Sequence, residues 1–280
     1  KANLIVTGSE VYDSTTSFSP SNLIITGVNG QTFTATGTAT LSSANVQTNQ
    51  PLSSISLTLS GVSGASTSNY NTLTVSQTSV SVTPKTLTAS MVAADKTYDG
   101  TTTATPTFTI SGLIGSQTLV VTGTATFDSA NAGSRTATAQ TVSLANGTNG
   151  GLASNYSLSA GQTDTATISK ATLTISSITA QNKVYDATNA ATISAYTSNV
   201  IGADQVTFSS TPTFASVNAA NGITVTASSI TISGADAGNY TLATTSRTTT
   251  ANITKANLIV TGSEVYDSTT SFSPSNLIIS

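Results

Sequence analysis

Residues 31–41 read QTFTATGTATL, and this stretch decides the fold class of the chain. Its apolar or small residues are Phe33, Ala35, Gly37, Ala39 and Leu41. A threonine stands at each position between them. Successive side chains of a β-strand point to opposite faces, so this alternation places hydrophobic groups inward and β-branched threonines outward. The stretch predicts a half-buried strand, and residues 103–110 and 121–127 repeat the pattern.

Signals for helices are nearly absent, because apolar residues do not recur at the spacing of three and four that marks a helix face. We therefore expect an all-β protein made of tandem antiparallel β-sandwich or β-grasp-like modules. At residues 165–176 one predicted strand runs into the next without a flexible linker, and residues 252–261 do the same. Such joints predict that the modules form a stiff, elongated rod.

The chain is built from repeats. Residues 1–25 return letter for letter at 255–279. Between the two copies a looser repeat opens at Lys1, Lys85, Lys170 and Lys255. A fixed long period is the signature of an array of similar structural units. The expected division is into repeat modules at 1–84, 85–169 and 170–254, with 255–280 either opening a fourth module or completing the third.

Composition excludes several classes of partner and of chemistry. There are 8 Lys and Arg against 11 Asp and Glu, and the net charge of −3 gives no reason to expect nucleic acid. No apolar run approaches the roughly 20 residues that span a bilayer, so we expect no membrane insertion. The chain has no His and no Cys, which excludes a Ser-His-Asp or Cys-His arrangement. We expect no enzyme activity, no cofactor and no metal.

Four motifs recur at fixed offsets. The first is a Tyr-Asp pair, at Tyr12 and Asp13, Tyr98 and Asp99, Tyr185 and Asp186, and Tyr266 and Asp267. The second is a Phe or Leu with an Asn four residues later, at Leu41 and Asn45, Phe127 and Asn131, and Phe214 and Asn218. The third is an Asn-Tyr pair, at Asn69 and Tyr70, Asn155 and Tyr156, and Asn239 and Tyr240. The fourth is a closing strand that ends in Lys, as in TATISK and TANITK.

The Tyr and Asn motifs are interpreted as structural. We expect the tyrosine of each Tyr-Asp pair to bury its ring in the core while its hydroxyl meets a backbone group. The aspartate should cap a turn through its side-chain oxygens. In the Asn-Tyr pair, the Asn suits a turn with positive φ and the Tyr would anchor the start of a strand. Ligand or cation binding by the same residues is the open alternative.

The order of these motifs resembles the YDG-type repeat, which occurs in tandem in large bacterial surface and secreted adhesins, including filamentous-haemagglutinin-like proteins. The resemblance is strongest at residues 96–102 (KTYDGTT), 131–133 (NAG) and 233–242 (SGADAGNYTL). The first module departs most, with Glu10 in place of the Lys and Ser14 in place of the Gly. The resemblance implies an extracellular stalk or adhesive repeat and no catalytic residues.

The expected function is therefore a structural stalk or fibre at the bacterial cell surface. Its expected partners are the neighbouring modules of the same chain and, through residues 255–280, further copies in a homopolymer. The alternative is a module that binds glycan or ice through Thr-rich sheet faces, in which case surface glycans would be partners.

Overall fold

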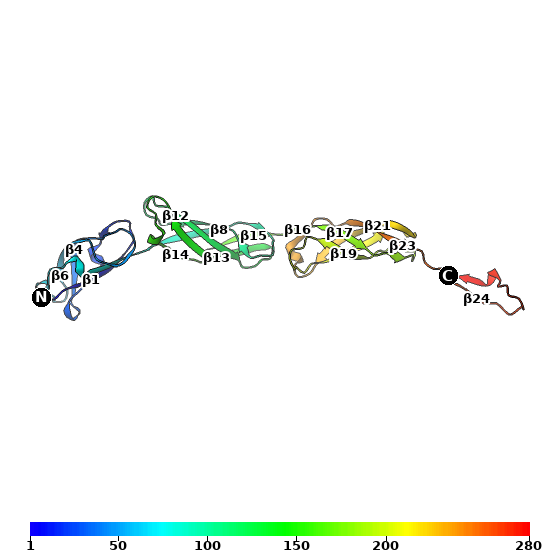
Figure 1. Ribbon diagram of the computed structural model, residues 1–280, viewed down its shortest axis with the longest axis horizontal. Coiled ribbons are helices and arrows are strands. Elements are labelled where there is room, and N and C mark those ends of the chain that lie inside the picture. Colours follow the sequence, from blue (N-terminus) through cyan, green and yellow to red (C-terminus); the bar gives the residue numbers. More distant parts are fainter. The chain divides into compact units, whose positions relative to one another are not determined.

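The computed structural model describes all 280 residues, and the regular structure consists of β-strands and short 3-10 helices (Figure 1). The predicted all-β class is confirmed. The chain divides into two compact units. The first holds Lys1–Asp95, Thr102–Ser129 and Ser134–Thr167, and the second holds Lys96–Thr101, Ala130–Gly133 and Ile168–Ser280. Two loops of the second repeat thus belong to the same unit as the third repeat.

The first repeat forms one sheet of seven strands. They are β1 (Ile5–Val11), β2 (Ser17–Phe18), β3 (Leu23–Thr26), β4 (Thr32–Thr40), β5 (Gln47–Gln50), β6 (Ser54–Gly61) and β7 (Thr78–Thr83). Their order is β2-β4-β3-β1-β7-β5, and β6 pairs with β4. The stretch that predicted the fold becomes β4, with Phe33 and Ala39 buried and the threonines between them mostly exposed.

The second repeat forms two sheets. Its strands are β8 (Lys85–Ala93), β9 (Lys96–Thr97), β10 (Thr103–Ala104), β11 (Pro106–Ser111), β12 (Leu119–Phe127), β13 (Gly133–Asn146), β14 (Tyr156–Leu158) and β15 (Thr163–Ser169). One sheet contains β11-β8-β14, and the other contains β10-β12-β13-β15. The last residues of β15 pair with β9, and this pair lies in the second unit.

The third repeat and the C-terminal segment supply the remaining strands. They are β16 (Ala171–Leu173), β17 (Ile175–Ala180), β18 (Lys183–Val184), β19 (Ile193–Ser198), β20 (Thr207–Phe214), β21 (Ala220–Ser233), β22 (Tyr240–Leu242), β23 (Arg247–Thr254), β24 (Val260–Gly262) and β25 (Leu277–Ile279). The largest sheet has the order β18-β23-β21-β20, and β16-β22 and β17-β19 form separate pairs. Strands β24 and β25 make a two-stranded sheet of their own.

Short 3-10 helices connect several strands. They are η1 (Pro20–Asn22), η2 (Val28–Gly30), η3 (Thr67–Asn69), η4 (Val75–Gln77), η5 (Ala153–Asn155), η6 (Ala237–Asn239) and η7 (Pro274–Asn276). Each has three residues. No helix of the structure has the length and apolar character needed to cross a membrane.

The sheets are mixed, which differs from the antiparallel β-sandwich that was one of the two expected module types. Strand β1 runs parallel to β7, from the pair of Val6 and Thr78 to the pair of Val11 and Thr83. In the third repeat β18 likewise runs parallel to β23, and β16 to β22. Alternation along a strand sets which face a side chain occupies, and it carries no information about the direction of the neighbouring strand. Because opening and closing strands point the same way, the chain enters each of these repeats at one end and leaves it at the other.

The hydrophobic core of the first repeat continues into the second. Val6, Phe18 and Val80 are fully buried among the strands of the first sheet. Leu87 and Tyr156, from β8 and β14, belong to the same buried cluster. The third repeat has its own clusters, around Ile175, Ala227 and Ile230 and around Phe214, Val225 and Ile253.

Candidate functional site

The Tyr-Asp loops are tight turns capped by their aspartates, as predicted. The Oδ1 atom of Asp99 accepts a hydrogen bond from the backbone N–H of Thr101 at 2.9 Å. The same contact joins Asp13 to Thr15, Asp186 to Thr188, and Asp267 to Thr269. Where Lys precedes the pair, its ammonium closes the loop. Lys96 Nζ lies 2.8 Å from both Asp99 Oδ1 and the carbonyl oxygen of Thr101.

These contacts stabilise the charged form of the aspartates. The Lys183 ammonium and the Thr188 N–H lower the pKa of Asp186 to about 2. Partial burial acts to raise the pKa of Asp99, but the Lys96 ammonium and the Thr101 donors hold it below its usual value. In the first repeat Glu10 replaces the Lys, and its carboxylate accepts a hydrogen bond from the Ser19 N–H at 3.2 Å instead.

The tyrosines of these loops meet the Asn-Tyr tyrosines of the following repeat. Tyr12 packs edge-on against Tyr156, with ring centroids 5.4 Å apart and an angle of 78° between the ring planes. Tyr98 packs against Tyr240 with nearly the same geometry, at 5.5 Å and 77°. All four rings are buried. Each contact lies within one compact unit, the first pair in the first unit and the second pair in the second.

The expectation that a backbone group satisfies the Tyr-Asp hydroxyl was wrong for both buried pairs, because a side chain of the next repeat does so. Tyr12 accepts a hydrogen bond from Gln117 Nε2 at 2.9 Å, and Tyr156 donates one to the Oε1 atom of that amide. In the second unit, Tyr98 and Tyr240 both donate to Asp204 Oδ2, at 2.8 and 2.6 Å. Burial and the Asp204 carboxylate raise the pKa of Tyr98, and the same causes act on the pKa of Tyr240.

The Asn-Tyr asparagines form a second bridge between repeats. Asn155 Oδ1 accepts a hydrogen bond from the Val46 N–H at 2.9 Å, and its Nδ2 donates to Asn45 Oδ1 at 2.9 Å. Asn239 repeats the arrangement in the second unit. It accepts from the Ala132 N–H at 2.9 Å and donates to Asn131 Oδ1 at 3.1 Å.

The expected positive φ at these asparagines was also wrong. Asn69, Asn155 and Asn239 each end a 3-10 helix, and none of them has positive φ. Asn155 and Asn239 instead contribute through hydrogen bonds of their side chains. Two of the tyrosines that follow start strands, since Tyr156 opens β14 and Tyr240 opens β22, whereas Tyr70 makes only an isolated bridge with Ala2.

Two of the predicted Tyr-Asp tyrosines are not in a core. Tyr185 and Tyr266 are exposed, because neither ring has an Asn-Tyr tyrosine packed against it. In the first repeat Asn69 is exposed, whereas Asn155 and Asn239 of the later repeats are buried. Tyr70 is buried within its own repeat, where it packs against Phe33 and its hydroxyl donates to Gln31.

The residues that bind the Tyr hydroxyls and the Asn-Tyr asparagines were not predicted as partners from the sequence. Gln117 and Asp204 hold the tyrosine hydroxyls, and they follow Ile114 and Ile201 by three residues in their repeats. Asn45 and Asn131 were recognised as a recurring motif without a role. Their fixed offset from Leu41 and Phe127 was the available signal, but it does not identify a partner more than 100 positions away in the sequence.

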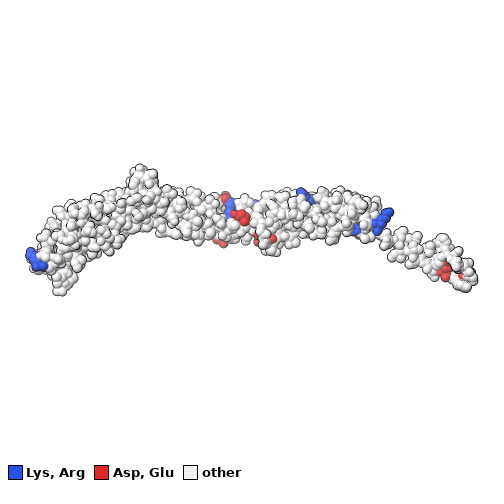
Figure 2. Space-filling view, in the orientation of Figure 1, with Lys and Arg blue, Asp and Glu red and all other residues white.

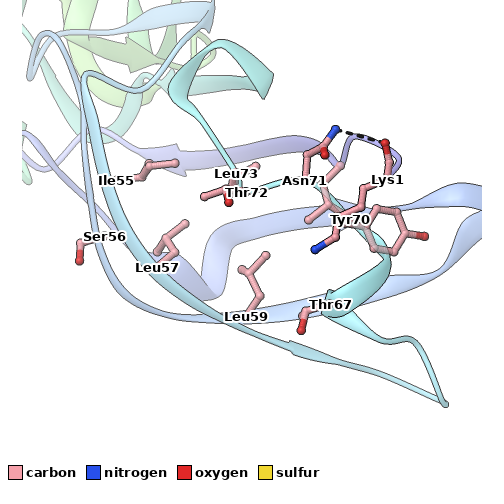
Figure 3. A pocket seen from close by; sticks show the side chains of 11 residues that line it. Lys1, Ile55, Ser56, Leu57, Leu59, Thr67, Tyr70, Asn71, Thr72 and Leu73 are labelled. Atoms are coloured by element: carbon pink, nitrogen blue, oxygen red, sulfur yellow. Dashed lines mark hydrogen bonds between the residues drawn. The ribbon is translucent and has the colours of Figure 1, made fainter.

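An open pocket lies beside the Asn-Tyr motif of the first repeat (Figure 3). It has a volume of about 490 Å³, and Leu57, Leu59, Tyr70 and Asn71 contribute to its lining. Asn71 Nδ2 is already used, since it donates to the carbonyl oxygen of Lys1 and to Asn3 Oδ1. Lys1, Ser56, Thr67 and Thr72 also line the pocket, so it presents polar as well as aliphatic side chains.

Charged side chains are sparse over the surface. Figure 2 shows Lys, Arg, Asp and Glu as a few separated spots on the face in view. In the whole chain no three Asp or Glu residues gather into a group that could hold a metal ion. The recurring polar chemistry of the molecule is thus concentrated in the Tyr and Asn contacts that join the repeats.

One protein family matches the sequence of this chain. The model of the YDG domain matches residues 83–166 and 169–251, which correspond to the second and third repeats. No curated protein and no solved structure matches the chain.

Proposed function

The chain belongs to the YDG domain family, and from this premise we propose that it is a non-catalytic structural segment of a bacterial extracellular adhesin or matrix filament. In this role the repeats act as spacers that hold a functional part of the protein away from the cell. The neighbouring repeats of the same chain are its principal binding partners.

The parallel pairing of opening and closing strands is the observation that carries this proposal. Residues Val6 to Val11 of β1 and Thr78 to Thr83 of β7 advance together, so the first repeat passes the chain from one end to the other. A spacer benefits from ends that lie apart, because each added repeat then adds length.

The joints between repeats supply the stiffness that a spacer needs. The contacts between the first and second repeats, and those between the second and third, each include a buried Tyr pair. Each set also includes a buried Asn that makes two hydrogen bonds to a loop of the preceding repeat. Aromatic pairs of this geometry contribute about 0.5–1.5 kcal/mol beyond the area they bury, and each hydrogen bond about 1 kcal/mol. The sum is enough to oppose bending at the joint.

Small-angle X-ray scattering of the full chain tests the proposal. A compact particle of this length has a radius of gyration of about 19 Å by the usual size scaling. Three repeats in line, each roughly 30–40 Å long, give a rod of about 100 Å and a radius of gyration near 30 Å. A measured value close to that of the compact particle would refute the spacer function.

One specific surface supports a second proposal, that of glycan or ice binding. Strands β4 and β6 pair over eight consecutive positions without a register shift, from Phe33 and Gly61 to Thr40 and Ser54. Their outward side chains are Thr and Ser. By contrast, bulges interrupt the pairing of β12 with β13 and of β20 with β21. Replacing Thr36 and Thr58 by Lys should abolish binding on a glycan array if this face binds sugars.

A further inference from the structure

The first repeat holds its opening and closing strands side by side in the middle of its sheet. In the order β2-β4-β3-β1-β7-β5, strands β1 and β7 are neighbours, and each has a further strand on its other edge. They run parallel and pair at six consecutive positions, from Val6 and Thr78 to Val11 and Thr83. The two ends of the repeat are thus connected directly by one continuous ladder of backbone contacts.

The direction of the two strands decides how this ladder responds to tension. A pull on the chain before Val6 draws β1 toward its own start, and a pull after Thr83 draws β7 toward its own end. Because the strands are parallel, these forces lie along the strand axis and oppose each other, so all six pairs resist sliding at the same time. If the two strands were antiparallel, the same pull would act at one end of the ladder and open its pairs one after another.

Further contacts secure the end of the ladder that faces the second repeat. The Tyr12 N–H donates to the carbonyl oxygen of Thr83 at 2.9 Å. Thr83 Oγ1 donates to the carbonyl oxygen of Glu10 at 3.1 Å. The Tyr12 ring packs against Tyr156 of the second repeat. The residue that extends the ladder is therefore also the one that contacts the next repeat.

The surroundings of the ladder limit the access of water to its hydrogen bonds. On the core side Val6 and Val80 are fully buried, and Val82 is 3% exposed. Strand β3 covers part of the other edge of β1, and β5 covers part of the other edge of β7. Where water cannot replace the partner of a stretched hydrogen bond, breaking that bond costs more. Burial therefore strengthens the resistance of the ladder to sliding.

The later repeats divide the same kind of contact into two short ladders. In the second repeat β14 runs parallel to β8 over three positions, and β15 runs parallel to β9 over two. In the third repeat β16 pairs with β22 over three positions and β18 with β23 over two, again in parallel. The ladder of the first repeat is longer than each of these. Tension on a later repeat therefore loads fewer pairs together.

We propose that the first repeat bears load along the chain, with the ladder of Val6–Val11 and Thr78–Thr83 acting as a shear clamp. This inference rests on the proposed spacer function, because a spacer between two attached points is the part of a protein that is stretched. The clamp adds resistance to force to a role that is otherwise defined by length. Under rising tension the second and third repeats unfold first, and the first repeat unfolds last.

Single-molecule force spectroscopy of the full chain with two directions of pull tests the clamp. The chain has no Cys, so two introduced cysteines define where the handles are attached. Ile5→Cys with Pro84→Cys places the handles at opposite ends of the ladder, so that tension shears it. Val11→Cys with Pro84→Cys is the matched control, which places both handles at one end, because Val11 pairs with Thr83. All three positions are exposed, so both variants should keep the wild-type urea midpoint.

The sheared variant should unfold at a force at least about twice that of the control, because six pairs rather than one resist at a time. Equal forces in the two directions, or a larger force in the control, overturn the proposal. The spacer function does not depend on this result, since X-ray scattering tests it without load. A chain that scatters as a rod and unfolds at equal forces would refute only the clamp.

A third variant tests whether the length of the ladder sets the force. Lys170→Cys with Lys255→Cys, both at exposed positions, attaches the handles just outside β16 and β23. This variant should unfold at a lower force than Ile5→Cys with Pro84→Cys, because at most three parallel pairs are loaded together. An equal or higher force for the third repeat would contradict the assignment of the strength to the ladder of β1 and β7.

Discussion

Replacing Asn155 by alanine should loosen the joint between the first two repeats. The Asn155 side chain is fully buried and connects the loop before β14 to the loop before β5. Alanine removes the acceptor of the Val46 N–H and the donor to Asn45 Oδ1. The backbone around position 155 needs no special conformation, because its φ is not positive. The effect should therefore come from the lost hydrogen bonds rather than from a changed turn.

The expected loss follows from the burial of the two partners. Val46 is half-buried, so its N–H loses its partner where water has limited access, at a cost of about 1–2 kcal/mol. Asn45 is exposed, so water replaces the bond to its Oδ1 and the additional loss is about 0.5 kcal/mol. The free energy of unfolding of the first unit should fall by about 2 kcal/mol in total.

Urea denaturation followed by tyrosine fluorescence measures this loss, because Tyr12 and Tyr156 meet at the same joint. A loss of about 2 kcal/mol lowers the urea midpoint by about 1 M for an ordinary dependence on denaturant. The matched control is Asn69→Ala. Asn69 holds the same motif position but is exposed, so its replacement should change the free energy of unfolding by less than about 0.5 kcal/mol. Equal midpoints for the two variants would show that the Asn bridge does not stabilise the joint.

Three further predictions follow from the same contacts. Tyr156→Ala should lower the free energy of unfolding by about 3–5 kcal/mol, the range for a large buried aromatic, whereas Tyr185→Ala should cost less than about 1 kcal/mol in thermal unfolding of the monomer. Burial and Asp204 raise the pKa of Tyr98 and Tyr240 above 10.0. The contact between these two residues should therefore be fully stable below pH 10 and weaken as the pH rises further. A spectrophotometric titration in which both tyrosines ionise at the ordinary pH would contradict this. The pKa of Asp186 is about 2 against an ordinary value of 3.8, so its loop should keep its structure above pH 4 and lose it as the pH falls through about 2, which amide chemical shifts of the loop would show.

Much of the local structure could be predicted from short stretches. The alternation in residues 31–41 predicted a strand, and β4 is that strand. Asp99 and its three equivalents cap turns two residues ahead, because an aspartate can reach its own backbone without help from the rest of the fold. Both successes rest on interactions between residues that are close in sequence.

The roles of the Tyr and Asn motifs could not be predicted in this way. Tyr12 and Tyr185 share the same local motif, yet one ring is buried and the other is exposed. The difference lies in whether a following repeat supplies a Tyr-pair partner and an amide or carboxylate such as Gln117 or Asp204. Sequence patterns around a tyrosine do not contain that information, because the partner is about 105 residues away.

The sequence by itself determined that the chain is all-β, that it is made of repeats, and that its loops turn at the Tyr-Asp pairs. Only the tertiary structure decided that the opening and closing strands run parallel and that the Tyr and Asn motifs face the next repeat. The physical reason is one of range. Alternation and turn capping act over a few residues, whereas strand direction and joint contacts depend on where chain segments more than 60 positions apart come together.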